Sequence, residues 1–408
     1  MTQTFLDQRR LDEAVSQRSY SYFDADISGR ADELRQAIAG KRVLVVGGGG
    51  TIGSATTTLI ADLGPTVLHV VDQSENYLAE LVRSLRGRPQ GLDVKEFRTL
   101  PLDYGSPVTG RYLAESAPFD VVLNFAALKH VRSEKDVYSL LQMLDTNVVR
   151  HVRFRKWLRD NGHGERYFAV STDKAANPTS LMGASKRLME DVVFAQDLSL
   201  SGQDTTARFA NVAFSNGSLL QGFIARLAQR QPLAAPRETR RYFVSQRESG
   251  EICALAALLG PAGRVMFPTL DPERELQPLD QVASRVLAVA GYEAVPFDDE
   301  EEARLAVEPL AASGRYPLLL TPLDTSGEKP YEEFVGAGEA QVESGLETLS
   351  AVRHVPTGAL TNDVLHLLED AVSRTTGTID KVALVRAIEG VIPTFSHRET
   401  GKSLDDRL

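Results

Sequence analysis

A run of glycines after an apolar segment constrains the fold of this chain more than any other feature. Residues 43–46 (Val-Leu-Val-Val) are apolar in succession, which suits a strand buried on both faces of a parallel sheet. Gly47, Gly50 and Gly53 follow with the spacing Gly-x-x-Gly-x-x-Gly at the start of a helical stretch. This spacing lets the backbone turn tightly against a pyrophosphate at a helix N-terminus. We expect a dinucleotide-binding turn with contacts from Gly47, Gly50, Thr51, Ile52 and Gly53.

A carboxylate follows the next predicted strand. Residues 66–71 have the pattern of a strand that ends at Asp72, 19 residues beyond Gly53. At this place a carboxylate accepts hydrogen bonds from the ribose of adenosine and repels a 2′-phosphate. The sequence therefore favours NAD over NADP as the cofactor. The alternative is a glycine turn that binds nothing.

Strands and helices alternate over the first half of the chain. Predicted strands cover 43–46, 66–71, 94–100, 121–124, 167–170 and 206–208, and two long helices cover 137–160 and 181–199. We therefore predict an α/β fold, a Rossmann-type doubly wound parallel sheet with a smaller, mixed C-terminal part that binds the substrate. The expected organisation is an N-terminal extension (1–40), the NAD-binding domain (41–218), the substrate-binding part (219–340) and a C-terminal extension (341–408).

Composition excludes several classes of function. The chain has 408 residues and a net charge of −10, without a Lys/Arg stripe interleaved with aromatics, so no nucleic-acid partner is expected. Cys253 is the one cysteine, which excludes an intrachain disulfide. The seven His show no metal-ligand spacing, so no metal is expected. No apolar run approaches the roughly 18 residues of a membrane-spanning helix and no signal-peptide core is present, so we expect a cytoplasmic protein without a membrane partner.

The segment Ser171–Lys186 (STDKAANPTSLMGASK) is similar to a redox active site in which one residue is replaced. A predicted strand leads into Asp173 and Lys174, and the helix that follows carries Met182 and, four residues on, Lys186. Short-chain dehydrogenases have a tyrosine at the first of these helix positions, with the lysine one turn later on the same face. A thioether cannot take a proton from an alcohol, so alcohol oxidation by that tyrosine is excluded. The adjacent Asp173 and Lys174 remain to move two different protons of one substrate.

Simpler interpretations of this segment are open. An Asp-Lys pair after a strand is often a solvated loop, and Met182 alone is most often core packing. Ser171 and Lys174 also match the Ser-x-x-Lys of penicillin-binding enzymes, but the Ser-Asp-Asn and Lys-Thr-Gly partners are absent. The rest of the chain has to decide between these interpretations.

Further strings accompany this segment in order along the chain. They are Asn-Phe-Ala-Ala-Leu-Lys-His-Val at 124–131 with Glu134, Asp-Thr-Asn-Val at 145–148, Arg-Phe-Ala-Asn-Val at 208–212, Arg-Tyr-Phe at 241–243 and Gly-Glu-Lys-Pro-Tyr-Glu-Glu at 327–333. With the glycine loop and the segment 171–186, they make the chain resemble the extended short-chain dehydrogenases of the nucleotide-sugar 4,6-dehydratase branch. This branch includes polysaccharide-biosynthesis or capsular proteins and is typified by UDP-N-acetylglucosamine 4,6-dehydratases. The resemblance covers roughly residues 41–334, and part of the branch also carries Met in place of the tyrosine.

The resemblance implies a redox-neutral dehydration in which NAD is a borrowed oxidant. Hydride leaves C4 of a hexose, the C5 proton and the C6 hydroxyl are lost, and hydride returns to C6. By likeness Lys174 is the C5 base, Asp173 is the acid for the C6 oxygen and Thr172 holds the C4 oxygen. Lys186 would bind the nicotinamide ribose. An amine base needs a depressed pKa, which we expect for Lys174 from burial beside the cationic cofactor and Lys186. The acceptor of the C4 hydroxyl proton is Asp173 or a water.

The resemblance also implies a nucleotide-sugar substrate, a UDP-hexose such as UDP-N-acetylglucosamine. Asn211, Ser218 and Arg241 fall where related enzymes clasp the pyrophosphate. Where the family has Arg-Pro before Gly-Glu-Lys, this chain has Thr325-Ser326, which leaves the base and the sugar open. Asp103 is expected at the adenine amino group. The other expected contacts are Tyr104 and Ala126 with the cofactor, and Lys129, His130 and Glu328 with the substrate.

Two other functions share these features. The same machinery can epimerise a sugar at C4 or C5, and a deoxy-keto product would separate dehydration from epimerisation. An NAD-binding scaffold or sensor that lost the tyrosine is the second alternative. A sensor has no need to keep Asp173, Lys174 and Lys186 together.

An apolar stripe in the helix 137–160 predicts association. In short-chain dehydrogenases this helix and the one at 181–199 pack against their copies in a four-helix interface. The stripe is wider than packing on one face of a sheet requires, so we expect a homo-oligomer, dimer or higher. The alternative is that the stripe covers the core of its own subunit. It consists of Val137, Leu140, Leu141, Leu144, Val148 and Val149.

Overall fold

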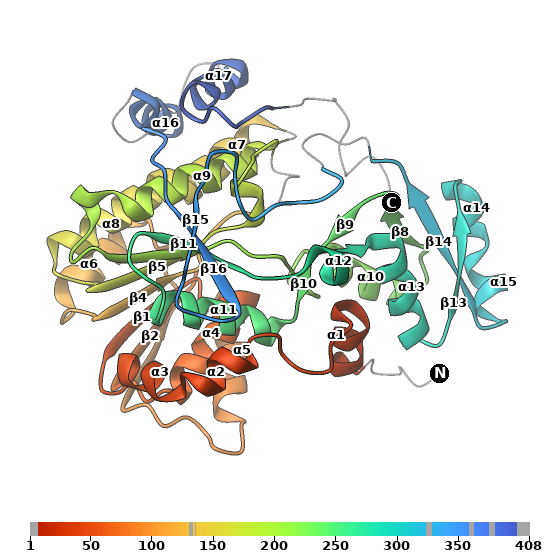
Figure 1. Cartoon of the computed structure of the whole chain (residues 1–408), viewed down its shortest axis with the longest axis horizontal. Helices are drawn as coiled ribbons and strands as arrows, with labels where there is room; N and C mark the ends of the chain where they lie inside the picture. Colours follow the sequence, from red (N-terminus) through yellow and green to blue (C-terminus); the bar gives the residue numbers. More distant parts are fainter. Residues whose placement is uncertain are drawn as a thin grey trace.

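The computed structural model describes residues 7–129, 134, 136–323, 329–358, 363–374 and 380–397. At its centre is a nine-stranded sheet in the order β15-β16-β11-β6-β5-β4-β1-β2-β3, with helices on both faces (Figure 1). The strands from β3 to β11 are parallel, whereas β16 and β15 continue the sheet in antiparallel pairings. The predicted α/β fold with a Rossmann-type sheet is confirmed.

The six strands predicted from the sequence are all present; the strand at 121–124 has the predicted ends and the other five have shifted ends. The order of the sheet reverses at β1, because β2 and β3 lie on one side of it and β4 to β6 on the other. Loops diverge at the carboxyl ends of the strands at such a switch point and leave a crevice for a ligand. The parallel strands are β1 (Arg42–Val46), β2 (Val67–Val71), β3 (Glu96–Leu100), β4 (Val121–Asn124), β5 (Arg166–Val170), β6 (Gln203–Ala207) and β11 (Arg264–Pro268).

Alternation within the strands divides the apolar side chains between two layers of helices. In β1, Val43 and Val45 belong to one cluster and Leu44 and Val46 to the other, because successive side chains of a strand point to opposite faces. A serine caps α5, α6, α9 and α11 by accepting a backbone N–H in the first turn. The first layer contains α2 (Asp24–Gly29), α3 (Ala31–Ile38), α4 (Thr51–Asp62), α5 (Glu75–Arg86) and α11 (Gln246–Leu258), and the second contains α6 (Pro107–Glu115), α8 (Arg150–Asp160) and α9 (Leu181–Phe194).

The main sheet and its helices extend beyond residues 41–218, to which the sequence analysis confined them. Helix α11 is buried along its length and packs on α4, and β11 joins the edge of β6. Strands β15 (Gln341–Val342) and β16 (Leu349–Arg353) complete this edge. The main sheet thus continues past residue 218, which the sequence did not show because apolar runs mark buried elements without showing which sheet they join. The division into domains stays a prediction.

A second lobe contains α1 (Gln8–Ser16) and most of the elements between residues 219 and 321 (Figure 1). Its three-stranded parallel sheet has the order β13-β14-β8 and is covered by α13. Helix α1, from the predicted N-terminal extension, packs on α13 through Leu11 and Val15. No helix in the described part of the chain combines the length and the apolar character needed to cross a membrane. The other elements between 211 and 321 are β7 (Asn211–Val212), α10 (Leu219–Ala228), β8 (Leu233–Pro236), β9 (Arg240–Arg241), β10 (Phe243–Val244), α12 (Pro272–Glu275), β12 (Gln277–Pro278), α13 (Leu279–Val289), β13 (Glu293–Phe297), α14 (Glu300–Leu305), α15 (Val307–Ala311) and β14 (Arg315–Thr321).

Two C-terminal helices cover the apolar stripe on which the predicted oligomer depended. The long helix predicted at 137–160 is α7 (Val137–Leu144), a π-helical turn (Asp145–Val149) and α8 in succession. Helices α16 (Asp363–Ser373) and α17 (Lys381–Val391) form one apolar cluster with it and with α9 (Figure 1). Leu140 and Leu144 are fully buried in this cluster. The stripe therefore lies against the chain's own C-terminal segment, so it no longer supports association, and the oligomer stays a prediction.

Candidate functional site

The glycine turn after β1 leaves no room for side chains. Gly47 has a φ of +70°, and a Cβ there would lie 2.6 Å from the backbone N of Ala126. A Cβ on Gly53 would lie 2.2 Å from the carbonyl oxygen of Gly47. Helix α4 begins at this turn, and its N-cap residue, Gly50, makes no side-chain capping bond. The first N–H groups of α4 are therefore available to an anion.

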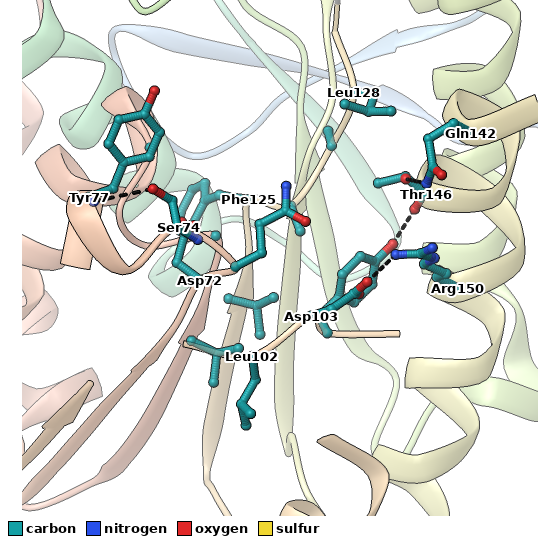
Figure 2. Close-up of a pocket in the computed structure, with 18 residues that line it drawn as sticks. Asp72, Ser74, Tyr77, Leu102, Asp103, Phe125, Leu128, Gln142, Thr146 and Arg150 are labelled. Carbon is teal, nitrogen blue, oxygen red and sulfur yellow. Dashed lines mark hydrogen bonds and ion pairs between the residues drawn. The ribbon is translucent and has the colours of Figure 1, made fainter. Parts of the chain in front are cut away.

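Asp72 lies where the sequence analysis expected a ribose-binding carboxylate. Its Oδ2 accepts a hydrogen bond from the backbone N of Gly49 at 3.0 Å, and its Oδ1 accepts one from Ser74 N at 2.8 Å. The carboxylate therefore joins the glycine turn to the start of α5. It borders a cavity of about 440 Å³, with Ser74 and Tyr77 beside it (Figure 2).

Most of the residues predicted to bind the cofactor line this cavity. It lies in the crevice at the switch point, between the turns after β1 and β4. Thr51, Ile52, Gly53 and Lys186 lie outside its lining; Thr51 instead accepts a hydrogen bond from the backbone N of Asn216 at 3.1 Å. The predicted residues that line the cavity are Gly47, Gly50, Asp72, Asp103, Tyr104 and Ala126.

The wall opposite Asp72 comes from the helix α7–α8 and was missed in the sequence analysis. Gln142, Thr146 and Arg150 line the cavity there (Figure 2). The Arg150 guanidinium forms an ion pair with Asp103, the residue predicted at the adenine amino group. The π-helical turn places Thr146 and Arg150 on this wall, and π-bulges occur frequently at functional sites. The sequence signal was the Asp-Thr-Asn-Val string at 145–148, which was noted without a role.

Asn147 from this string fixes the loop after β4. Its Oδ1 accepts a hydrogen bond from Leu128 N, and its Nδ2 donates to Leu128 O and to Ser185 Oγ, each at 2.9 Å. The side chain is buried and uses its acceptor and both of its donors. The loop at the mouth of the cavity is thereby tied to α9.

The predicted catalytic residues follow β5 as one hydrogen-bonded group. Asp173 is buried, and its Oδ1 accepts from Thr172 Oγ1 at 2.8 Å and from the backbone N of Lys174 at 2.9 Å. The Lys174 ammonium donates to the same oxygen at 3.1 Å. Three donors on one oxygen suit an acceptor-only carboxylate. A solvated Asp-Lys loop would not bury its carboxylate in this way, so that interpretation fails.

A second carboxylate, Glu332, also lies close to the Lys174 ammonium. Its Oε1 lies 3.6 Å from Lys174 Nζ, and its Oε2 lies 3.8 Å from Lys329 Nζ. Arg241 donates to the carbonyl oxygens of Lys329 and Pro330, each at 3.1 Å. Glu332 was missed because it is far away in sequence, although the Gly-Glu-Lys-Pro-Tyr-Glu-Glu string contains it.

The two carboxylates overturn the expected depression of the pKa of Lys174. Burial lowers this pKa, but attraction to Asp173 and Glu332 outweighs burial and raises it above the ordinary value for lysine. The sequence argument considered burial and neighbouring cations but left out the adjacent Asp173, and nothing in the sequence indicates that Glu332 lies close to Lys174. The chain holds Lys174 as an ammonium group.

Lys186 shows the opposite behaviour one turn after Met182. Burial lowers the pKa of Lys186 to about 8, although Glu190 opposes the change. Its Nζ donates to Val170 O at 2.7 Å, so the ammonium lies against the end of β5. Met182 is buried in the apolar cluster beneath α16 and α17, while its backbone N donates to Glu134 Oε1 at 2.9 Å. In this structure the Met182 side chain provides packing.

A buried ion-pair network supports the segment from behind. Ser171 Oγ donates to Glu190 Oε1 at 2.7 Å, and Arg208 donates to both oxygens of Glu190 at 2.8 and 2.7 Å. Arg208 also pairs with Glu339, and none of the three charged side chains is more than 4% exposed. Breaking a buried pair by removing one partner costs roughly 3–5 kcal/mol. The network therefore fixes the residue that precedes Thr172.

Of the predicted substrate residues, the structure describes Asn211, Ser218, Lys129 and Arg241, and the charge of Arg241 acts on Lys174. The β7–β10 pairing places Asn211 opposite Phe243, and Asn211 N donates to Tyr242 O at 3.1 Å, next to Arg241. Ser218 is the N-cap of α10 and accepts from Gln221 N. Lys129 Nζ donates to Ser215 Oγ at 3.4 Å, near that cap. His130 and Glu328, also predicted to bind substrate, lie outside the described residues.

Comparisons with known proteins agree with this fold. Curated relatives include the uncharacterized membrane protein MJ1061 of Methanocaldococcus jannaschii, 26% identical over 81% of this chain and 91% of that protein. The capsular polysaccharide biosynthesis protein CapD of Staphylococcus aureus is 24% identical over 78% of this chain, which spans 48% of CapD. The UDP-N-acetylglucosamine 4,6-dehydratase (inverting) of Campylobacter jejuni is 27% identical over 49% of this chain and 59% of the enzyme.

A solved structure shows the same architecture. The enzyme WbmF of Bordetella bronchiseptica in complex with NAD+ and UDP has a TM-score of 0.51, with 17% identity over 66% of this chain and 87% of WbmF. The family described as polysaccharide biosynthesis protein matches residues 43–353, well over half of the sequence. The chain therefore belongs to the polysaccharide biosynthesis protein family.

Proposed function

We propose that this chain is an NAD-retaining nucleotide-sugar 4,6-dehydratase that acts on a UDP-hexose, with UDP-N-acetylglucosamine as the first substrate to test. The observation that carries the proposal is the hydrogen-bonded Thr172–Asp173–Lys174 group at the carboxyl end of β5, built around the buried Asp173 carboxylate, with Met182 where a dehydrogenase has its tyrosine. The C. jejuni relative, named as a dehydratase of this substrate, and the nucleotide complex of WbmF support it.

The residues around the cavity fit NAD. The turn at Gly47 and Gly53 has no space for side chains, the first turn of α4 lacks a side-chain cap, and Asp72 borders the cavity. The Asp72 carboxylate would accept hydrogen bonds from the ribose. When bound, NAD would take a hydride from C4 of the hexose and return it to C6. Lys186 would hold the end of the cofactor nearest β5.

Asp173 and Lys174 would divide the proton transfers between them. Lys174, once it has lost a proton, takes the proton from C5 and later returns it there. Asp173 takes the proton of the C4 hydroxyl and delivers it to the departing C6 oxygen, so that water leaves. The net change is the loss of one water, and neither side chain is altered.

The Thr172–Asp173 hydrogen bond suggests how the enzyme works without the tyrosine. Thr172 Oγ1 donates to Asp173 Oδ1 at 2.8 Å. A sugar hydroxyl bonded to Thr172 Oγ1 could pass its proton to the Asp173 carboxylate in two short steps. This geometry favours Asp173 over a water as the acceptor of the C4 hydroxyl proton.

Product analysis tests the proposed reaction. We expect incubation with UDP-N-acetylglucosamine to give a product that is lighter by one water, without accumulation of NADH, because the cycle is redox-neutral. Mass spectrometry and absorbance at the NADH band measure the two results. An epimer of unchanged mass would support epimerisation instead. Persistent stoichiometric NADH would contradict the dehydratase, and no turnover across a panel of nucleotide sugars would support a scaffold.

Asp72→Ala is expected to weaken NAD binding by roughly 10- to 100-fold. The change removes a charge-assisted hydrogen bond worth roughly 1.5–3 kcal/mol. Calorimetric titration of NAD and NADP into both proteins measures the effect. Glu80→Ala, which removes an exposed carboxylate of α5 outside the cavity, is the control and should bind NAD nearly as well as the parent. Equal affinity of the parent protein for NAD and NADP would contradict the role of Asp72.

A further inference from the structure

Glu332 is a buried carboxylate with an incomplete set of partners. The residue is 5% exposed, and its Oε2 has no hydrogen-bond partner among the described residues. Leaving a buried polar group without a partner is unfavourable, so such a group in a native protein calls for an explanation. The adjacent Glu333 is exposed and accepts a hydrogen bond from Asn177 Nδ2 at 2.9 Å. The chain therefore turns one carboxylate of this pair inward and the other outward.

The inward carboxylate completes a cluster of five charged side chains. Asp173 and Glu332 flank the Lys174 ammonium at 3.1 and 3.6 Å. Lys329 faces Glu332 at 3.8 Å, and Arg241 is bonded to the backbone beside it. Burial raises the pKa of Glu332, and repulsion from Asp173 adds to this effect. Attraction to the cations Lys174, Arg241 and Lys329 lowers the pKa and so opposes it. The carboxylate thus has two cations close to it, Lys174 at 3.6 Å and Lys329 at 3.8 Å.

We propose that Glu332 is a positioning residue of the catalytic group: with Asp173 it holds Lys174 as an ammonium ion and sets the pH at which this amine becomes available as a base. The inference rests on the proposed function in that Lys174 acts on the substrate. Burial destabilises the Lys174 ammonium, and the neighbouring carboxylates oppose this effect. Two carboxylates stabilise the ammonium against burial, so neutralising one of them must favour the free amine.

Labelling of Lys174 in the full-length protein tests this balance without any substrate. Side-chain amines react with acylating reagents in their neutral form, and the Lys174 side chain is 22% exposed. The labelled peptide is quantified by mass spectrometry between about pH 7 and 10, near and below the ordinary pKa of lysine. Lys156, exposed on α8, serves as the internal reference in every sample.

Glu332→Gln is expected to increase the labelling rate of Lys174 about tenfold at a given pH, since each unit of pKa changes the amine fraction tenfold. Glu333→Gln, the same change on the outward neighbour, should label like the parent. Glu332→Asp keeps the charge one methylene farther away and should fall between the parent and Glu332→Gln. If Glu332→Gln does not fold, the labelling rate of Lys174 in Glu332→Asp is compared with that in the parent, and a higher rate is expected. A rate at Lys174 equal to that of the parent in the folded Glu332 variants, or an equal increase in Glu333→Gln, would overturn the proposal.

A pH profile of product formation extends the test to catalysis. The limb on the acid side, where the Lys174 amine becomes protonated, is expected to move to lower pH in Glu332→Gln and to stay in place in Glu333→Gln. A merely structural role would lower the rate at every pH without moving this limb. Because labelling uses no substrate, its failure and the failure of the dehydratase assay are separate results.

Discussion

Lys174→Ala is expected to abolish exchange of the C5 proton with solvent deuterium and to reduce product formation at least about 10²–10⁴-fold, the usual contribution of one proton-transfer group. The amine is the candidate base in the hydrogen-bonded group at the end of β5, because Asp173 is proposed to carry the proton from the C4 hydroxyl to the C6 oxygen. Mass spectrometry of the sugar after incubation in heavy water measures the exchange. NAD binding should be unchanged, because Lys174 does not line the cofactor cavity.

Met182→Leu is the control for this experiment. Met182 is buried in the cluster beneath α16 and α17, and leucine preserves an apolar side chain of similar volume there. We expect this variant to keep most of the activity, since the thioether takes no part in proton transfer. If Met182→Leu were as inactive as Lys174→Ala, the loss of activity would not be specific to the amine, and this would contradict the assignment of Lys174 as the base.

Leu368→Asp is expected to expose the apolar surface between α7 and α16, destabilise the chain and make it self-associate. Leu368 is fully buried in the cluster with Leu140, Leu144 and Val148. Truncation of a buried leucine to alanine costs roughly 2–5 kcal/mol, and an unpaired buried charge costs more. Denaturant unfolding measures the loss of stability, and light scattering measures the association.

Leu367→Asp is the matched control, because Leu367 is the adjacent residue on α16 and is 36% exposed. We expect the control to unfold at nearly the same denaturant concentration as the parent protein. Light scattering on the parent protein at micromolar concentration also tests the predicted oligomer against the 44.6 kDa of one chain. Equal effects of the two variants would contradict the packing of α16 on α7.

Much of the fold could be predicted from the sequence because the signals are local. The apolar run before Gly47 specifies a buried strand, and a Cβ on Gly53 would clash with the carbonyl oxygen of Gly47 in the same turn. The clash of a Cβ on Gly47 is with Ala126 after β4 and depends on the fold. Asp72 could be assigned because its distance from the glycines is fixed by one helix and one strand. The nearness of Thr172, Asp173 and Lys174 was likewise evident from their order after β5.

Other features were decided by the tertiary structure, because they depend on segments far apart in the chain. The apolar stripe of α7 predicted that something covers it, but a periodic pattern carries no information about what does; here the cover is α16 and α17. The sequence argument for Lys174 included burial and predicted a lowered pKa. Folding brings Glu332, which is distant in sequence, to 3.6 Å from the Lys174 ammonium. Attraction to the two carboxylates then raises the pKa of Lys174 instead of lowering it. Local sequence thus determined which elements form and which side chains share a turn, whereas long-range packing determined which charges meet, and the energy of a charge depends on those neighbours.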